Sequence, residues 1–349
     1  MSPVRFCLIG AGRAGLVHAE NVARRIPDAC LAALCDANPE ALNTAADRYG
    51  VEKRYADFSD VMADPDIDAV IIVTPTFLHC RIACAAAESG KHVFLEKPMA
   101  ITVEECEAIN QAVAKADVRL QLGFMRRFDK GFQRVKEVIA SGELGAVMTV
   151  KSIGRGPGLP PPWIYDLKKS NGILAEVNSH DFDTVRWLAG DEAARVFAQA
   201  GNFKCADARD GFPDFYDNAI VSLKFARGAL GTVDGTCPCH YGYDARVEAL
   251  CERGLLQAGT VKDGSFFQAQ VNDVKVTGEG TVLGSTVKSW RNVFKDAYLD
   301  EMEHFIACVR EGKTPAATGK DGLEAVRLVA AANKSILTGD PIAIDRSDS

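Results

Sequence analysis

The stretch that decides the fold is residues 4–15, which read Val4-Arg5-Phe6-Cys7-Leu8-Ile9-Gly10-Ala11-Gly12-Arg13-Ala14-Gly15. A short apolar run stops at a glycine cluster, and residues 14–25 then have the pattern of a helix. The pattern G-x-G-x-x-G is weak alone, but here it follows a strand and opens a helix. Its glycines allow a tight turn, backbone approach to a pyrophosphate, and close packing of helix on strand. The stretch therefore predicts a dinucleotide site, in which the free N–H groups at the helix start favour phosphate charge.

The residue after the second predicted strand, residues 31–35, selects the dinucleotide. Asp36 stands about 21 residues beyond Gly15, where an acidic side chain binds the adenosine ribose hydroxyls. Its negative charge would repel a 2′-phosphate, and Ala37 and Asn38 supply no arginine to hold one. We therefore predict NAD rather than NADP. The alternative is a tight strand–helix turn that binds no cofactor.

Strand and helix signals alternate through the first 123 residues. The apolar runs are continuous rather than alternating, as expected for a parallel sheet that is covered on both faces. We expect strands at 4–9, 31–35, 69–73, 93–95 and 120–122, and helices at 14–25, 39–49, 78–89 and 103–116. This order predicts an α/β fold that begins with a doubly wound Rossmann domain, residues 1–123.

The pattern changes after Gly123, which begins a second predicted domain at residues 124–349. A helix at 132–141 and a strand beginning at 146–152 precede several strand-like runs between 194 and about 276, including 218–225. Arg227-Gly228 and Arg253-Gly254 are typical of hairpin turns. Closing helices are expected at 296–310 and 323–337. This domain is predicted to be α+β with a mostly antiparallel sheet, and the closing segment (about 296–338) is predicted to pack partly on the first domain.

Composition excludes several classes of protein. A net charge of −7 argues against a nucleic-acid partner, because phosphate binding needs a concentrated basic surface. No apolar run has the length of a membrane span, and no export signal precedes the first strand. Eleven cysteines are an odd number, and the cluster Cys237-Pro238-Cys239-His240 lacks a second ligand pair at zinc-site spacing. We predict no metal and a reduced, cytoplasmic protein without membrane contact.

Glu96-Lys97-Pro98 lies at the carboxyl end of a predicted strand, the edge at which open α/β sheets bind ligands. A residue before proline is held extended, so Lys97 would project from a fixed backbone. Lysine suits proton transfer when a partly desolvated pocket lowers its pKa. The alternative is an ordinary surface lysine at a strand end.

The second candidate stretch is residues 172–183. If a helix runs through it, Glu176 and His180 share one face at i, i+4 spacing. Histidine is the natural base for a hydroxyl proton near neutral pH, and a neighbouring carboxylate can orient it. A buried structural histidine and a two-ligand fragment of a metal site are the alternatives.

Taken together, these motifs resemble the Gfo/Idh/MocA oxidoreductase family, and its inositol dehydrogenase branch in particular. The resemblance covers nearly the whole chain, and the order and spacing of its motifs make it specific. The motifs are Gly10-Ala11-Gly12-Arg13-Ala14-Gly15, Thr74-Pro75-Thr76 with His79, Glu96-Lys97-Pro98, Gly123-Phe124-Met125-Arg126-Arg127-Phe128-Asp129, Ser179-His180-Asp181-Phe182-Asp183 and the late Asp300-Glu301-Met302-Glu303-His304-Phe305.

The resemblance implies a Rossmann domain joined to an open, mostly antiparallel sheet, which binds substrate and commonly assembles into dimers or tetramers. It implies that Lys97 contacts the reacting hydroxyl and that His180 is the acid/base, with Glu176 as the carboxylate that could orient it. The implied NAD-binding set is Gly10, Gly12, Arg13, Ala14, Gly15, Asp36, Thr74, Pro75, His79, Glu96, Lys97 and Arg126. The implied substrate-binding set is Lys97, Arg127, Trp163, Asn178 and His180. One departure stands out, because the family usually has aspartate where this chain has Glu176.

The expected reaction is the reversible oxidation of a secondary ring hydroxyl of a cyclic polyol or sugar, with inositol as the first candidate. An aldose, a glycoside or an anionic sugar is an alternative, the last because of the cations Arg126, Arg127, Arg155, Lys168 and Lys169. From another class, the chain could be a non-catalytic regulator that senses a dinucleotide. Such members of the family tend to lose the lysine or the histidine, whereas this chain keeps Lys97 and His180.

Overall fold

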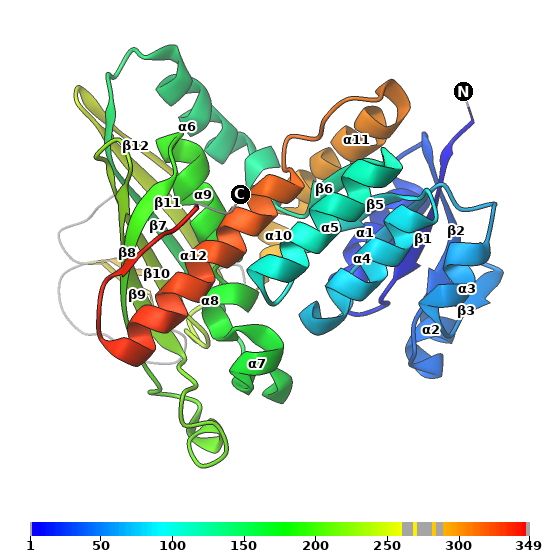
Figure 1. Ribbon diagram of the computed structural model, residues 1–349, viewed down its shortest axis with the longest axis horizontal. Coiled ribbons are helices and arrows are strands. Elements are labelled where there is room, and N and C mark those ends of the chain that lie inside the picture. The colour runs from blue at the N-terminus through cyan, green and yellow to red at the C-terminus, as the bar shows by residue number, and fades with distance from the viewer. Residues whose placement is uncertain (1, 260–267, 271–280, 284–288, 347–349) are drawn as a thin grey trace. The chain divides into compact units, whose positions relative to one another are not determined.

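The computed structural model describes residues 2–259, 268–270, 281–283 and 289–346 (Figure 1). The chain divides into two compact units. Unit 1 is Met1–Phe128 with Asp296–Val326, and unit 2 is Asp129–Lys295 with Arg327–Ser349. The stretch up to about residue 276, where strand-like runs were expected, lies partly outside the described residues.

Unit 1 is built on a six-stranded sheet with the order β3-β2-β1-β4-β5-β6 (Figure 1). All five neighbouring strand pairs are parallel. The run Ala69-Val70-Ile71-Ile72 is buried along its whole length, because helices cover both faces of the sheet. The strands are β1 (Val4–Ile9), β2 (Ala29–Cys35), β3 (Lys53–Tyr55), β4 (Ala69–Ile72), β5 (His92–Leu95) and β6 (Leu120–Leu122).

The helices of unit 1 fall into two groups, one on each face of the sheet. One apolar core joins the sheet to α1, α2 and α11, through side chains such as Val22, Leu42 and Phe305. The other joins it to α3, α4, α5 and the first turns of α12. The bounds are α1 (Gly15–Arg24), α2 (Pro39–Tyr49), α3 (Phe58–Ala63), α4 (His79–Glu88), α5 (Val103–Ala116), α11 (Lys295–Glu311) and α12 (Gly319–Thr338).

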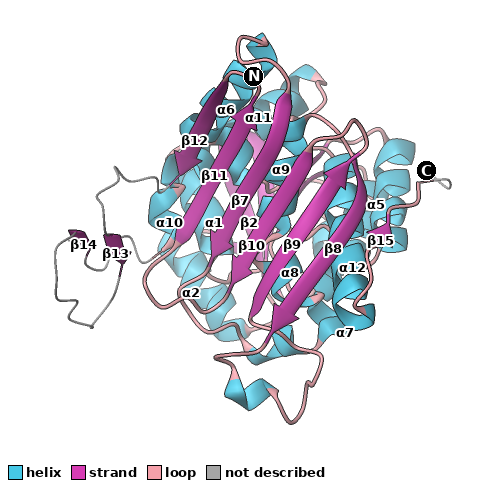
Figure 2. Ribbon diagram, turned by 90° about the vertical axis from the view of Figure 1, so that its left-hand side faces the viewer, coloured by secondary structure: helices cyan, strands magenta, loops and turns pink. Residues whose placement is uncertain are grey.

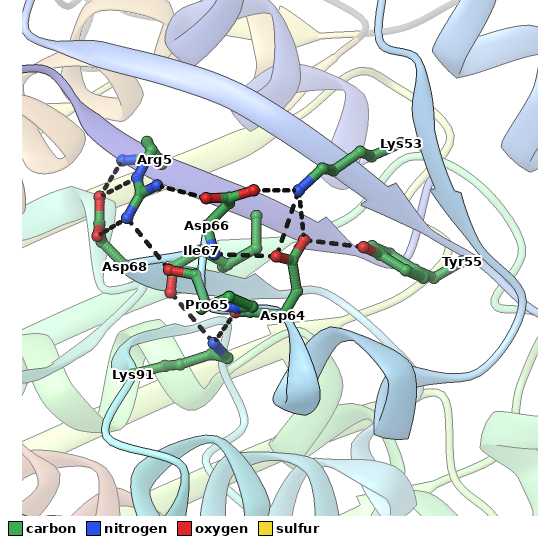
Figure 3. Close-up of polar contacts among 9 residues, drawn as sticks. All are labelled: Arg5, Lys53, Tyr55, Asp64, Pro65, Asp66, Ile67, Asp68 and Lys91. Atoms are coloured by element: carbon green, nitrogen blue, oxygen red, sulfur yellow. Dashed lines mark hydrogen bonds and ion pairs between the residues drawn. The ribbon is translucent and has the colours of Figure 1, made fainter.

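A polar cluster ties the loop before β4 to the amino ends of three other strands (Figure 3). Arg5 of β1 donates to Asp68, and Lys53 of β3 pairs with Asp64. The ammonium group of Lys91, just before β5, is buried against the carbonyl oxygens of Asp64 (2.7 Å) and Ile67. These contacts fasten the edge opposite to the carboxyl ends of the strands.

Unit 2 is built on a seven-stranded sheet with the order β12-β11-β7-β10-β9-β8-β15, in which only the β7–β10 pair is parallel. Figure 2 shows this sheet face-on, with α6 and α9 behind its strands. Burial alternates along β9, as expected for a strand with one covered face. The strands are β7 (Val147–Arg155), β8 (Ala193–Gly201), β9 (Asn218–Phe225), β10 (Leu230–Thr236), β11 (Asp244–Cys251), β12 (Gly254–Gly259) and β15 (Ile342–Ala343); β13 (Gln268–Gln270) and β14 (Thr281–Leu283) form a separate pair.

The helices of unit 2 are α6 (Lys130–Ser141), α7 (Leu167–Ser170), α8 (Gly172–Glu176), α9 (Ser179–Ala189) and α10 (Trp290–Val293). The long helix α12 begins in unit 1 and ends in unit 2. A parallel Rossmann sheet with a second, mostly antiparallel sheet confirms the predicted fold class. No helix within the described residues is both long enough and apolar enough to cross a membrane.

Candidate functional site

The glycine loop between β1 and α1 has the geometry that its motif predicts. Gly10 has φ of +104°, and a Cβ atom there would stand 2.6 Å from the carbonyl oxygen of Val73. A Cβ atom on Gly15 would overlap the carbonyl oxygen of Gly10. At Gly12, by contrast, a Cβ atom would meet nothing within 4 Å. Two glycines are thus required by the fold, whereas Gly12 faces open space beside exposed Arg13 and half-buried Ala14.

Asp36 follows β2 and holds the same loop. Its carboxylate accepts hydrogen bonds from the main-chain N–H of Ala11 (2.7 Å) and of Asn38 (2.8 Å). The side chain is partly exposed, so the carboxylate can also receive hydroxyl donors from outside. The open space at Gly12 and the carboxylate at the end of β2 fit a dinucleotide with free ribose hydroxyls.

Replacing Asp36 by asparagine is expected to lower the preference for NAD over NADP about 10- to 100-fold. The change removes a charged acceptor for the ribose hydroxyls, worth about 1.5–3 kcal/mol, and the repulsion of a 2′-phosphate. Asparagine keeps an oxygen for the N–H groups of the loop. The check is kcat/KM with each dinucleotide, and an unchanged ratio would contradict this role of Asp36.

The loops after β4 and β5 lie side by side at the carboxyl edge of the sheet, because these parallel strands are neighbours. His79 joins them. Its Nδ1 lies 2.8 Å from the carbonyl oxygen of Pro98, and its Nε2 lies 2.9 Å from that of Thr74. The imidazole is 1% exposed, whereas Pro75 beside it is exposed. His79 is therefore a clamp between the two loops.

Burial lowers the pKa of His79, although the two carbonyl oxygens act in the opposite direction. A neutral imidazole carries one N–H and can donate to only one of the two oxygens. The positions of Thr74 and Pro98 therefore both depend on the packing of this one side chain between the two loops.

Replacing His79 by alanine is expected to lower the free energy of unfolding by about 1–3 kcal/mol, since buried acceptors lose their partner. It should also lower kcat, because the loop that carries Lys97 loses its clamp. His92→Ala is the matched control: His92 accepts the N–H of Arg119 (3.0 Å) at the amino end of β5. Urea unfolding and steady-state kinetics should show stability losses in both variants but a lower kcat only in His79→Ala. Equal kcat values would refute the clamp.

Lys97 leaves β5 with its side chain half-buried, and its peptide bond to Pro98 is cis. Its main-chain N–H donates to Oε2 of Glu96 at 3.2 Å. Glu96 is 5% exposed, and its other oxygen lies 2.7 Å from Nε2 of His18. The carboxylate of Glu96 therefore points inward, beneath the backbone of Lys97.

Arg126 and Arg127 lie in a short 3-10 helix, Met125–Phe128, and both are buried. Arg127 donates to the carbonyl oxygen of Ala316 (2.7 Å) and pairs with Asp321 (2.9 Å). Within unit 1 the guanidinium of Arg127 thus anchors the segment that leads into α12.

In unit 2, residues 172–183 form two helices rather than the one helix that would place Glu176 and His180 on a common face. α8 ends at Glu176 and α9 begins at Ser179, so Glu176 and His180 do not share an uninterrupted helix face. Asn178 lies at the break, as the residue before α9. Its N–H returns to the carbonyl oxygen of Ile173, and its side chain donates to the carbonyl oxygen of Gly154 (3.0 Å) and to Asp181 (2.8 Å). The condition of a single helix, on which the i, i+4 argument for this pair depended, is therefore not met.

The remaining candidates of unit 2 lie on these short helices. His180 is 4% exposed in the first turn of α9, and Glu176 is half-buried at the end of α8. Asn178 is fully buried and packs against Gly235, where a Cβ atom would overlap its Oδ1. Trp163 lies half-buried in the 3-10 helix Pro162–Tyr165. The structure thus places Asn178 within the packing of α9 on the sheet.

Asp181 is a site neighbour that the sequence reasoning missed. Its carboxylate accepts from Ser152 of β7 (2.5 Å) as well as from Asn178, and it is fully buried. This network fixes the first turn of α9, on which His180 stands. The sequence signal that could have revealed Asp181 is its charge within an otherwise buried helix, because a buried carboxylate needs hydrogen-bond donors.

The cations considered for an anionic substrate differ in their surroundings. Arg155 pairs with Asp234 and donates to the hydroxyl of Tyr241 (3.0 Å), so its charge is compensated. Lys168 and Lys169 are exposed at the surface. None of these contacts by itself favours an anionic ligand.

The cysteine cluster near residue 237 has ordinary structural contacts. The thiol of Cys237 donates to the carbonyl oxygen of Gly158 (3.1 Å), and that of Cys239 to Gly242 (2.9 Å). Burial raises the pKa of Cys237 to about 12, which makes its thiolate scarce. All eleven cysteines are free thiols.

Two family models match the chain. The model described as "Oxidoreductase family, NAD-binding Rossmann fold" covers residues 4–124, and the one described as "GFO/IDH/MocA C-terminal domain" covers residues 132–257. The chain is 36% identical over 334 residues to a myo-inositol 2-dehydrogenase of Thermotoga maritima, covering 95% of this chain and 96% of that protein. It is 36% identical over 341 residues to an inositol 2-dehydrogenase of Rhizobium meliloti, covering 98% and 99%.

Solved structures agree with these relatives. A scyllo-inositol dehydrogenase from Lactobacillus casei, crystallised with NAD(H) and scyllo-inositol, superposes with a TM-score of 0.85 at 26% identity. The match covers 98% of this chain and 99% of that one.

Proposed function

The chain belongs to the GFO/IDH/MocA oxidoreductase family, and from this premise we propose that it is an NAD-dependent dehydrogenase that oxidises a secondary ring hydroxyl of an inositol to a ketone. The family predicted from the motifs is thereby confirmed. The observation that carries the proposal is that similarity to inositol dehydrogenases runs through both units. A cofactor domain alone would say little about substrate, since one fold serves many reactions.

The residues for NAD are those of the glycine loop, Asp36 and the carboxyl edge of the sheet. In the proposal, the N–H groups that open α1 hold the pyrophosphate, and Asp36 holds the adenosine ribose. The predicted contacts of Thr74, Pro75, Glu96 and Arg126 with the cofactor remain part of this proposal. NAD, when bound, accepts the hydride that leaves the ring carbon.

His180 and Lys97 are proposed to move the proton. His180 takes the O–H proton as the carbon gives up its hydride, so that the C–O bond becomes a carbonyl and charge balances. Lys97 binds the reacting oxygen, and its positive charge stabilises the developing alkoxide. Glu176, on the half-buried end of α8, is proposed to orient His180. Arg127, Trp163 and Asn178 are kept as proposed substrate contacts.

A panel of substrates tests the proposal. Purified protein with NAD is given myo-inositol, scyllo-inositol, glucose, a glycoside and a sugar phosphate, and NADH absorbance is followed. The highest kcat/KM is expected with an inositol. A preference for the aldose, the glycoside or the phosphate would move the substrate class while leaving the chemistry intact. Tight NAD binding without turnover of any of them would favour the regulator instead.

We also propose that the protein is a cytoplasmic homo-oligomer, a dimer or a tetramer. Support comes from the face of the unit 2 sheet that no described helix covers (Figure 2), where Ile220 is 58% and Leu255 is 52% exposed. Apolar side chains in such a position favour association. Free thiols throughout the chain suit a reducing compartment. Light scattering of the purified protein measures the assembly, and a monomer would refute it.

A further inference from the structure

Three buried polar side chains from distant parts of the sequence meet in unit 1. They are His18 of α1, Glu96 at the end of β5 and Glu301 of α11, and they are 0%, 5% and 0% exposed. One nitrogen or oxygen atom of each lies within 4.8 Å of the others. We call this group the buried trio.

The trio reaches Lys97 through the carboxylate of Glu96. One oxygen of that carboxylate lies 2.7 Å from Nε2 of His18, and the other accepts the main-chain N–H of Lys97 at 3.2 Å. A Cβ atom on Gly123 would stand only 2.8 Å from the carboxyl carbon, so a side chain there would push Glu96 away. Glu96 is thus confined on one side by backbone and held on the others by the main-chain N–H of Lys97 and by Nε2 of His18.

Glu301 has no such donors. Both its carboxyl oxygens are buried without a hydrogen-bond partner among the described residues. Its main-chain carbonyl, by contrast, is fixed by Nε2 of Gln121 in β6 (2.8 Å). The backbone of α11 is therefore anchored at the point where it presents the Glu301 side chain to the trio.

The surroundings of the Glu301 carboxyl favour its neutral form. Burial first, and then the charge of Glu96, raise its pKa well above the usual range. The titratable groups that face it are His18 from α1 and Glu96 from β5. On its own helix, Asp300 is partly exposed and Glu303 is exposed. Two bare carboxylates in this buried site would repel each other, whereas one proton removes the conflict.

Aromatic rings close the site around His18. The His18 ring lies 4.9 Å from that of Phe94 and 5.5 Å from that of Tyr298, measured between centroids. These contacts fix the plane of the imidazole, and hence the direction in which Nε2 meets Glu96.

We propose that His18 and Glu301 are positioning residues for Lys97: Glu301 keeps a carboxyl proton, His18 donates to Glu96, and the Glu96 carboxylate then holds the main chain of Lys97. The inference rests on the proposed function for the catalytic part of Lys97 only. The proton and the hydrogen bond belong to the protein without any ligand.

Infrared difference spectroscopy tests the proton directly. At neutral pH the wild-type protein should show the C=O stretch of a protonated carboxylic acid, and Glu301→Gln should lose it. The matched control is Asp64→Asn, since Asp64 is also buried but is held ionised by Lys53, with its pKa lowered to about 2. That variant should keep the band. Wild-type protein without the band, or a metal ion bound at one per chain and lost in Glu301→Gln, would overturn the proposal.

The pH dependence of stability gives a second reading. Above the ordinary pKa of glutamate, about 4.3, the unfolded chain has released the Glu301 proton that the folded protein keeps. The folded state then binds more protons, so wild-type stability falls as pH rises. Glu301→Gln has no carboxyl proton to keep. Its melting temperature should therefore rise relative to that of the wild type as the pH is raised from about 5 to about 8. A constant difference would overturn the proton assignment.

Positioning is tested by His18→Leu, which removes the donor to Glu96 but keeps the packing against the aromatic rings. Hydrogen–deuterium exchange of the Lys97 amide should quicken at least about tenfold, and kcat should fall by about the same factor with little change in KM for NAD. Unchanged exchange in His18→Leu would overturn the positioning role. Absence of inositol oxidation by wild type would instead remove the proposed function and leave the exchange result standing.

Discussion

Replacing His180 by alanine is expected to lower the turnover number with the best inositol about 100- to 10,000-fold. The reason is that the O–H proton loses its acceptor at the moment when hydride leaves the carbon. The dissociation constant for NAD should change by less than about twofold, since the proposed cofactor contacts belong to unit 1 and His180 to unit 2. Lys97→Ala should show a similar loss of turnover. Stopped-flow kinetics and NAD titration by protein fluorescence measure the two quantities.

His180 is 4% exposed, so alanine could disturb the fold itself. His180→Gln keeps the size of the side chain without a comparable base and should be as inactive as His180→Ala. His240→Ala is the control, because His240 is an exposed histidine of the same unit and should retain full turnover. Wild-type turnover in His180→Gln and in Lys97→Ala would remove the assignment of both residues.

Sequence patterns predicted the bounds of those helices and strands that begin and end through contacts between neighbouring residues. α5 begins and ends where expected, because Thr102 and Glu105 form a capping box at its start. β9 also has the predicted bounds, since its alternating side chains fit a strand with one covered face. By contrast, the short β3 and α3 were not predicted. β3 reads Lys53-Arg54-Tyr55, and a polar edge strand of three residues carries no periodic signal.

The site shows the same division between local and distant causes. The glycine loop could be predicted, because turn, backbone approach and packing are all encoded within six residues. The clamp by His79 depends on carbonyl oxygens, which the identity of a residue does not reveal. His18 and Glu301 are buried together only through the order of strands and helices, so no spacing in the sequence brings them into view. At the break, Asn178 donates to the carbonyl oxygen of Gly154, 24 residues away, a contact that no local pattern reveals.

Gly15→Ala is expected to lower the stability of the protein, whereas Gly12→Ala is expected to lower its affinity for NAD, although both residues belong to one motif. Gly15→Ala places a methyl group onto the carbonyl oxygen of Gly10, a backbone atom that cannot rotate away. It should cost about 1–3 kcal/mol or more of unfolding free energy. Gly12→Ala meets nothing within 4 Å and should cost less than about 0.5 kcal/mol. Urea unfolding without NAD measures both values.

For NAD binding, Gly12→Ala is expected to be the variant with the clear defect. The open space at Gly12 is where the proposal places the pyrophosphate, so a methyl group there should weaken NAD binding about 10- to 100-fold for each charged hydrogen bond it displaces. Calorimetric titration of Gly12→Ala should therefore show a stable protein that binds NAD poorly. If that variant binds NAD as wild type does, the pyrophosphate does not lie over Gly12. A loss of stability in Gly15→Ala would then show only that the strand–helix turn needs a glycine. It would agree with the alternative of a tight turn that binds no cofactor.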